Sequence, residues 1–389
     1  MNKKLLFSIL LVLLLILSFP GASAAQDEIV VHSNSFEVNF PADIMFRLDV
    51  ESPSAITDIR LCYTMDKITT AILITEIFPK FIPANKVSVR WPLQMKKTGG
   101  LPPGADIQYW WKIKDGSSHY LETIPKAVKF DDARYSWNKL TDGQVSLFWH
   151  KGDRVFAGEL MDTAQQTLSK LSGDTGAYLE RPVKIYIYAN QKELLSALMF
   201  PQEWTGGIAF TQFGTIAVPL DPEADSAAFN YGKKTIAHEL THLVTYQMTF
   251  NPYNDIPLWL NEGLSVYSEG ELDAYRQILL NKAIAEDKLI SVRSLCGSFP
   301  TDYEQALLSY AQSYSLVKFL ITNYGSDRML QLLATFKQGS SYNGALEKAY
   351  GFDMEGLGSL WRARISGAAA RTLWHGLDIE RDVIGVRAG

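Results

Sequence analysis

Two histidines and a glutamate stand close together in the chain at a spacing that suits metal binding. His238, Glu239 and His242 belong to the sequence His-Glu-Leu-Thr-His. Residues four positions apart lie on the same face of a helix, about one turn from each other. Two imidazoles placed in this way reach one Zn²⁺, each at about 2.0–2.1 Å, and the glutamate between them can face the metal-bound water. The alternative is a pair of histidines that only satisfy their hydrogen bonds on a helix.

A catalytic zinc site usually has three protein ligands and one open position, so a third ligand is required. Glu262, in Trp-Leu-Asn-Glu-Gly, follows His242 by 20 residues. That interval leaves room for one helix to end, for a turn that contains Pro252 and Pro257, and for a second helix to begin. We therefore predict that His238, His242 and Glu262 bind one zinc ion per chain.

The two motifs together resemble the gluzincin branch of the zinc metallopeptidases, and most closely the peptidase MA-like domains of bacteria. The similarity covers residues 135–365, with sharp motifs only between residues 238 and 325. The resemblance implies a thermolysin-like catalytic fold, in which a small sheet lines the cleft with its edge strand and two helices carry the zinc ligands. It also implies a peptidase whose partner is a peptide or protein substrate.

Two further positions are similar to the aminopeptidase-type gluzincins. Glu269 stands seven residues after Glu262, where those enzymes have an acid that orients a zinc-bound histidine. Tyr310 matches the tyrosine that stabilises the oxyanion, although Tyr314, one turn further along, could compete for that role. The plainer alternatives are an exposed carboxylate at a helix end for Glu269 and core packing for either tyrosine.

The chain departs from these families in two places. The Gly-x-Met-Glu-Asn strand of the aminopeptidases is absent, and residues 206–218 stand in its place without a carboxylate that could hold a free amine. Thermolysin-type enzymes have an acid four residues after the ligand glutamate, where this chain has Val266. We therefore expect an endopeptidase, in which residues 206–218 bind the substrate backbone by strand addition.

The ligand set predicts a mechanism and leaves two other functions open. Zinc lowers the pKa of its water toward about 7. Glu239 then takes a proton as the water attacks the peptide carbonyl, and a donor such as Tyr310 helps to stabilise the oxyanion. One alternative is a catalytically silent gluzincin fold that serves as a surface binding module. The other is a zinc hydrolase that acts on a substrate other than a peptide.

The N-terminal region has the period-two pattern of β-strands. Apolar and polar residues alternate from about residue 27 to 131, in runs that begin at Ile44, Ile59, Val87 and Ile107. We expect turns at Pro53 and Gly99-Gly100 and a hairpin at Asp115-Gly116. Several short strands of this kind are typical of a small β-sandwich, so residues 26–132 are predicted to form one with an immunoglobulin- or fibronectin-III-like topology.

The pattern changes from about residue 145. A helical stripe is predicted over residues 154–171, and short strands over 208–210 and 215–218. A long helix is expected to end at Tyr324-Gly325, because glycine favours the left-handed helix cap. Residues 133–389 are therefore predicted to form an α+β catalytic domain, mixed in its first third and helical afterwards.

The first 25 residues have the pattern of a signal peptide. Lys3 and Lys4 precede an apolar run over residues 5–19, and Ala22-Ser23-Ala24 is a pattern that a signal peptidase accepts. The run has 15 residues, short of the ~20 that span a bilayer. We expect a secreted or cell-surface protein with no stable membrane insertion after cleavage; an uncleaved anchor is the alternative.

The amino-acid composition narrows the classes of protein to which this chain can belong. The 389 residues are 47% hydrophobic with a formal net charge of −5, which argues against a disordered chain and against a nucleic-acid partner. Cys62 and Cys296 fall in different predicted domains, and the sequence decides neither a disulfide between them nor the oligomeric state. Cys62 lies on the strand face opposite Leu61 and Tyr63, so we expect it to be less buried than most cysteines.

Overall fold

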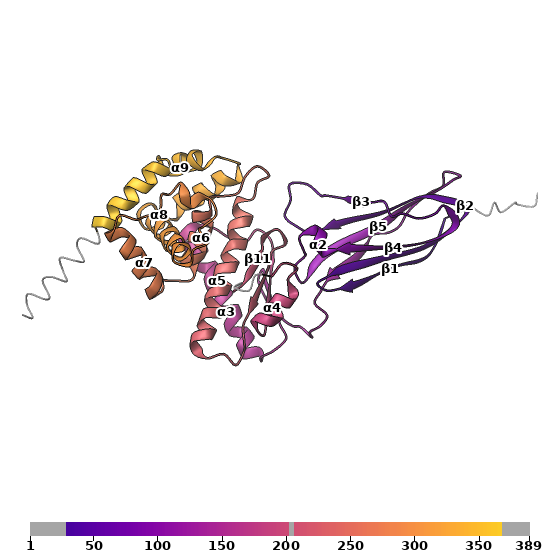
Figure 1. Cartoon of the computed structure of the whole chain (residues 1–389), viewed down its shortest axis with the longest axis horizontal. Helices are drawn as coiled ribbons and strands as arrows, with labels where there is room; N and C mark the ends of the chain where they lie inside the picture. The colour runs from indigo at the N-terminus through magenta and orange to yellow at the C-terminus, as the bar shows by residue number, and fades with distance from the viewer. Residues whose placement is uncertain (1–28, 202–205, 368–389) are drawn as a thin grey trace, which may run out of the picture.

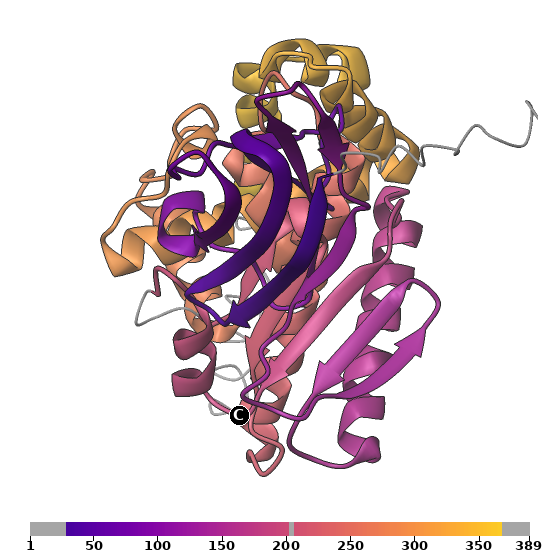
Figure 2. The ribbon, with the colours of Figure 1, turned by 90° about the vertical axis from the view of Figure 1, so that its right-hand side faces the viewer.

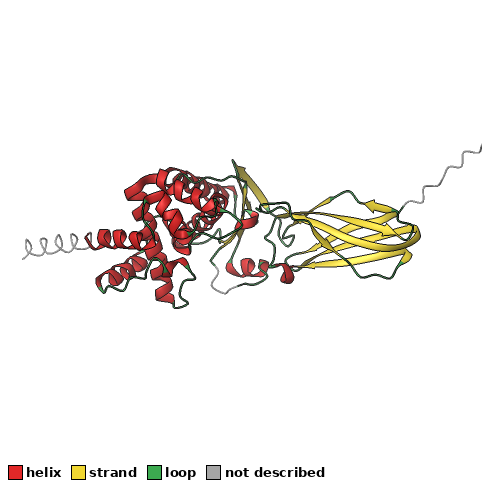
Figure 3. Ribbon diagram, turned by 90° about the horizontal axis from the view of Figure 1, so that it is seen from above, coloured by secondary structure: helices red, strands yellow, loops and turns green. Residues whose placement is uncertain are grey.

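The structure is a computed structural model that describes residues 29–201 and 206–367. It is an α+β chain with a seven-stranded sheet at one end, and a five-stranded sheet followed by helices at the other (Figure 1). Figure 3 shows the strands of the first sheet and the helices at opposite ends of the long axis. The predicted signal peptide, residues 1–25, lies outside the described residues. Within the described ranges, no helix is long and apolar enough to cross a membrane.

The first sheet is organised around one long strand, β2 (Asp43–Met65). Its other strands are β1 (Val30–Asn39), β3 (Thr75–Ile77), β4 (Ala84–Gln94), β5 (Ala105–Asp115), β6 (Tyr120–Glu122) and β7 (Lys126–Phe130), and a short helix α2 (Met95–Thr98) follows β4. The first half of β2 pairs with β1 and β4, and its second half pairs with β3 and β5. The sheet therefore curls (Figure 2), and buried residues of both halves form one core.

This connectivity differs from the predicted one at Pro53. The sequence predicts a turn there, but β2 runs through this residue, so the runs that begin at Ile44 and Ile59 belong to one strand. The pairing of β2 with β4 shifts register between Glu51 and Ile56, an irregularity of the kind that accommodates a residue without an N–H. Since all seven strands hydrogen-bond as one sheet, an immunoglobulin- or fibronectin-III-like sandwich is not confirmed.

The hairpin predicted at Asp115-Gly116 joins β5 to β6 and is held by a buried carboxylate. The side chain of Asp115 accepts hydrogen bonds from Ser52 Oγ at 2.7 Å and from the backbone N–H of His119 at 2.9 Å, and it lies 2.8 Å from His119 Nδ1. Burial raises the pKa of Asp115, but the hydrogen bonds from Ser52 and His119 outweigh it and lower the value to about 2. Asp115 therefore stays ionised in the folded chain.

The cysteines are both free thiols. Cys62 is fully buried, so the expectation that it is less buried than most cysteines was wrong. Its neighbours in register are Glu76 of β3 and Trp110 of β5, and these residues pack on the face that the strand pattern alone assigns to solvent. Burial raises the pKa of both thiols to about 11, so neither is an activated nucleophile.

The second sheet has the strand order β11-β12-β10-β9-β8. These strands are β8 (Asn138–Asp142), β9 (Val145–Trp149), β10 (Val183–Tyr188), β11 (Ile208–Phe210) and β12 (Thr215–Pro219). The three inner strands are parallel, whereas β8 and β11 are antiparallel strands at the two edges. Helices α3 (Arg154–Thr175) and α4 (Gln191–Ala197) belong to this mixed part of the chain. The sheet thus presents β11 as an edge strand, as the resemblance implies.

The remaining helices follow the second sheet. They are α5 (Ser226–Thr249), α6 (Leu258–Ser268), α7 (Ala274–Ala285), α8 (Tyr303–Lys337), α9 (Tyr342–Tyr350) and a helical stretch over residues 354–367, with 3₁₀ turns η1 (Thr211–Phe213) and η2 (Ser294–Cys296). Gly325, where the sequence predicts a helix end, has φ 78° and kinks α8. The helix resumes after this kink, so the residues on both sides of Gly325 belong to α8.

Helix α5 is held by its buried stripe, and α6 by a close contact with α8. Ile236, Leu240, Leu243 and Val244 of α5 are fully buried, as the amphipathic pattern predicts. A Cβ added to Gly263 of α6 would lie 2.5 Å from Ser313 O of α8. The two helices therefore approach so closely that only glycine is accommodated there.

The two parts of the chain are joined by specific contacts. Lys184 Nζ of β10 donates to Asp106 at 2.6 Å, and Arg181 pairs with Asp66. The backbone N–H of Ile68 donates to Gln212 O of η1 at 2.7 Å. Because η1 directly follows the edge strand β11, the loop after β2 supports the chain next to that edge.

Candidate metal centre

Three side chains from two neighbouring helices converge on one point. His238 and His242 come from α5 and Glu262 from α6, and one ligand atom of each lies within 4.8 Å of the others. Glu262 Oε2 is 3.4 Å from His238 Nε2 and 3.6 Å from His242 Nε2. Two atoms that each bind a tetrahedral zinc at about 2.0–2.1 Å are themselves roughly 3.3 Å apart. These separations therefore suit ligands that share one cation.

The state of Glu262 gives an independent test of that fit. Its Oε2 is buried and has no hydrogen-bond partner. A buried carboxylate oxygen without a partner is costly unless a cation lies against it. Burial raises the pKa of Glu262, but His238 and His242 outweigh it and lower the value, so the carboxylate is ionised. The donor set and the unpartnered oxygen both fit zinc.

Each histidine is oriented by a second contact through its other ring nitrogen. His238 Nδ1 lies 2.7 Å from Glu269 Oε1, and His242 Nδ1 lies 3.1 Å from Asn261 Oδ1. Arg276 of α7 in turn donates to Glu269 Oε2 at 3.3 Å. These contacts fix the ring orientations and leave the Nε2 atoms directed at the metal position.

The family resemblance predicts Glu269 from the sequence, whereas nothing in the sequence predicts Asn261 or Arg276. Asn261 directly precedes Glu262, and neighbouring residues of a helix do not share a face, so spacing gives no signal for it. Arg276 lies on another helix altogether. An amide placed beside the ligand glutamate is the one local feature that could have drawn attention to Asn261.

Glu239 lies beside the metal position and faces the edge of the second sheet. A Cβ added to Gly207 would lie 3.2 Å from Glu239 Oε1, so the backbone that leads into β11 passes directly over this carboxylate. Burial raises the pKa of Glu239, and His242 and His238 only partly offset it. In the described part of the chain β11 pairs with β12 alone, so its other edge has no strand partner there.

Of the two tyrosines considered, Tyr310 is the one whose hydroxyl is influenced by the carboxylates of Glu262 and Glu239. Burial raises the pKa of Tyr310 to about 12, and the carboxylates of Glu262 and Glu239 act in the same direction. The hydroxyl therefore stays protonated and can donate a hydrogen bond. Tyr314 instead donates to Glu271 Oε2 at 2.9 Å and contacts Lys318, so its hydroxyl is engaged away from the metal position.

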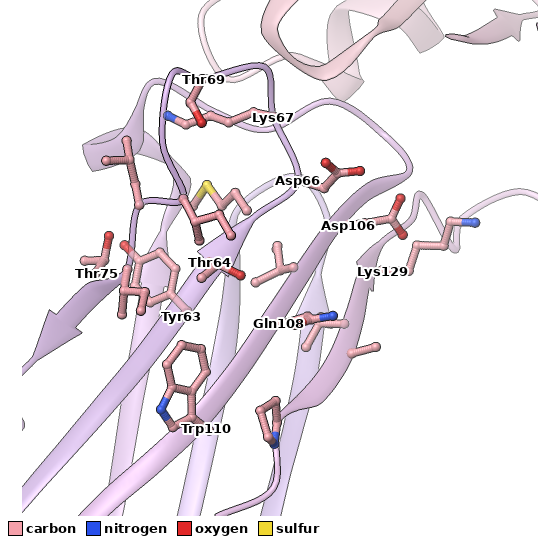
Figure 4. Close-up of a pocket in the computed structure, with 18 of the residues that line it drawn as sticks. Tyr63, Thr64, Asp66, Lys67, Thr69, Thr75, Asp106, Gln108, Trp110 and Lys129 are labelled. Atoms are coloured by element: carbon pink, nitrogen blue, oxygen red, sulfur yellow. The ribbon is translucent and has the colours of Figure 1, made fainter. Parts of the chain in front are cut away.

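A larger cavity lies elsewhere, on the first sheet. It has a volume of about 1080 Å³, and the loop that carries Lys67 and Thr69 lies at one end of it, with Tyr63, Gln108 and Trp110 on its sheet wall (Figure 4). No histidine lines it. Within residues 29–201 and 206–367, the His238, His242 and Glu262 group is the one set placed to hold a metal ion.

A His₂Glu group on two packed helices, with a further glutamate beside it, is the ligand arrangement of a gluzincin-type zinc site. The comparisons with known proteins agree. Residues 163–367, more than half of the chain, match the Peptidase MA superfamily, and the chain belongs to that family. The resemblance to the gluzincins is thereby confirmed.

Other comparisons add less. No curated protein matches this chain. One of the solved structures that match is the crystal structure of wild type OgpA from Akkermansia muciniphila, with 7% sequence identity and a TM-score of 0.22. The match covers 28% of this chain and 28% of that one, so this chain spans less than a third of that protein's length.

Proposed function

We propose that this chain is a zinc-dependent metallopeptidase that cuts within polypeptides. The observation that carries the proposal is the buried, unpartnered Oε2 of Glu262, placed between the Nε2 atoms of His238 and His242 with Glu239 alongside. Membership in the Peptidase MA superfamily supports the same chemistry.

The chain's own residues have distinct parts in the proposed reaction. His238, His242 and Glu262 would hold the zinc, which would supply Lewis-acid chemistry at the scissile carbonyl. Glu239, whose pKa is raised by burial, takes the proton of the attacking water and passes it to the leaving amine. Tyr310 donates a hydrogen bond to the carbonyl oxygen as negative charge develops there.

The open edge of β11 supports an endopeptidase. An extended substrate can add to this edge through backbone hydrogen bonds. The segment over residues 206–218 has no carboxylate to hold a free amine, so nothing there requires the substrate to begin at the cleft. The polypeptide can therefore continue past the metal centre in both directions.

We further propose that the protein is exported and that its first region is a sandwich-type module. The apolar run over residues 5–19 supports export to the outside or to the cell surface, and sequencing the N-terminus of the exported protein tests it. The curled sheet supports a module over residues 26–132 that precedes a catalytic domain over 133–389.

Cleavage of a diverse peptide pool by the zinc-loaded full chain tests the proposed reaction, with Glu239→Ala beside it. Mass spectrometry reports the cut sites, and metal analysis reports the zinc content. We expect wild-type cleavage at internal bonds and a loss of about 10²- to 10⁴-fold in Glu239→Ala, with zinc retained. A fully active variant, or one that loses its zinc, would refute the role of Glu239. No cleavage by zinc-loaded wild type would favour a non-peptide hydrolase or a silent binding module.

A further inference from the structure

A cavity of about 390 Å³ lies directly beside the metal centre. It is bounded by η1, by the C-terminal half of α5 and by the loop that leads into α6, and the metal ligand His242 forms part of its wall. Its volume falls in the range of small-molecule binding pockets. A group bound there would be adjacent to the scissile bond of a substrate held at the metal.

The residues that line this cavity are mostly polar and include one carboxylate. Asn254 Oδ1 is buried and has no hydrogen-bond partner. Asp255 contributes an exposed carboxylate, and its negative charge helps to raise the pKa of the Tyr246 hydroxyl in the same cavity wall. Among the described residues that line the cavity there is no lysine or arginine, and Asp255 is the one carboxylate. The local charge is therefore negative.

The aromatic residues of the cavity wall also favour a cationic group. The rings of Tyr246 and Phe250 lie 5.2 Å apart at a tilt of 38°. Burial raises the pKa of Tyr246 to about 12, so its ring carries a neutral hydroxyl. Aromatic faces attract lysine and arginine side chains, whose apolar stems also pack well against rings.

We propose that this cavity is a specificity subsite for a cationic side chain, lysine or arginine, next to the scissile bond. The inference rests on the proposed peptidase function and names the substrate class of that same site. An acidic side chain would meet the carboxylate of Asp255, and no lysine or arginine of the cavity wall offsets that repulsion. Arginine offers five N–H donors and lysine three, any of which can donate to this carboxylate.

Matched peptides separate charge from shape in the test. One pair differs only by arginine or its neutral isostere citrulline, and a second pair by lysine or norleucine. We expect wild type to favour the cationic peptide by roughly 10-fold in kcat/KM, the size of one charge-assisted hydrogen bond in a partly exposed site. In Asp255→Asn the ratio should fall to near one, and in Asp255→Glu it should return. The matched control is Asp327→Asn, since Asp327 is an exposed carboxylate of α8 outside this cavity.

A binding measurement separates the subsite from the catalytic proposal. Calorimetry with the zinc-loaded Glu239→Ala chain and the same peptides should show the preference for the cation, and adding Asp255→Asn should abolish it. If binding shows this preference while wild type cuts no peptide, the subsite stands and the peptidase proposal fails. A wild type that treats the paired peptides alike in cleavage and binding, or a preference that survives Asp255→Asn, would overturn the subsite.

Discussion

Replacing Glu269 by alanine is expected to weaken zinc binding by about 10- to 100-fold. Glu269 Oε1 lies 2.7 Å from His238 Nδ1, and its side chain is only 14% exposed, so this charge-assisted hydrogen bond is poorly screened by water. Such a bond contributes about 1.5–3 kcal/mol, and each 1.4 kcal/mol is roughly tenfold in a dissociation constant. The variant also leaves Arg276 without one of its carboxylate partners.

The assay is competition for zinc against a chromogenic chelator at neutral pH. Glu269→Gln keeps an oxygen that can accept from Nδ1–H, so we expect a smaller loss than in Glu269→Ala. Glu271→Ala is the matched control, because Glu271 lies two residues further on and pairs with Lys318 at the surface. If Glu269→Ala binds zinc as tightly as wild type, or if the control loses as much affinity, the proposed orientation of His238 by Glu269 is wrong.

The oxyanion donor, the closest helix contact and a buried carboxylate each give a further prediction. Tyr310→Phe should lower kcat by roughly 10²-fold without loss of zinc, because one oxyanion donor is removed. Tyr314→Phe should leave kcat near the wild-type value, and equal effects of the two variants would contradict Tyr310 as the oxyanion donor. Gly263→Ala should destabilise the chain by about 1–3 kcal/mol through overpacking against α8. Gly158→Ala, in α3 with no atom within 4 Å of the added Cβ, should instead stabilise it by up to about 1 kcal/mol. Thermal unfolding measures both variants, and similar shifts in the two would contradict the close approach of α6 to α8. The pKa of Asp115 is lowered from 3.8 to about 2 in the folded chain, so its contribution to stability is present above pH 3.8 and is lost as the pH falls toward 2. Asp115→Asn should therefore flatten the acid-induced loss of stability in this window, and an unchanged acid unfolding profile would refute that role.

Local spacing along the chain is enough to predict the metal ligands and the elements that carry them. Residues four apart on a helix share a face whatever surrounds them, so the sequence alone pairs His238 with His242 as ligands. The buried stripe of α5 and the strand at residues 208–210 follow from hydrophobic periodicity in the same way, whereas the place of that strand at the sheet edge follows from the family resemblance. The interval between His242 and Glu262, broken by Pro257, suffices to place the second ligand helix.

Other features depend on residues that are distant in the chain, and packing alone settles them. The choice between Tyr310 and Tyr314 is open in the sequence because both lie on one helix, one turn apart. Only the tertiary structure shows that the hydroxyl of Tyr314 is engaged by Glu271 and Lys318. The sequence pattern likewise does not predict that β2 continues through Pro53, because the strands that pair with β2 on either side of this residue come from later parts of the chain.

The surroundings of the metal centre show the same division. Arg276 reaches Glu269 from a separate helix, and Asp255 lines a cavity whose other walls come from η1 and α5. The hydrophobic periodicity of the sequence indicates which face of a helix or strand is apolar, but it does not indicate which other element packs against that face. The ligands are therefore specified locally by the sequence, whereas their orientation and the cavity beside them depend on how the helices and the sheet edge pack.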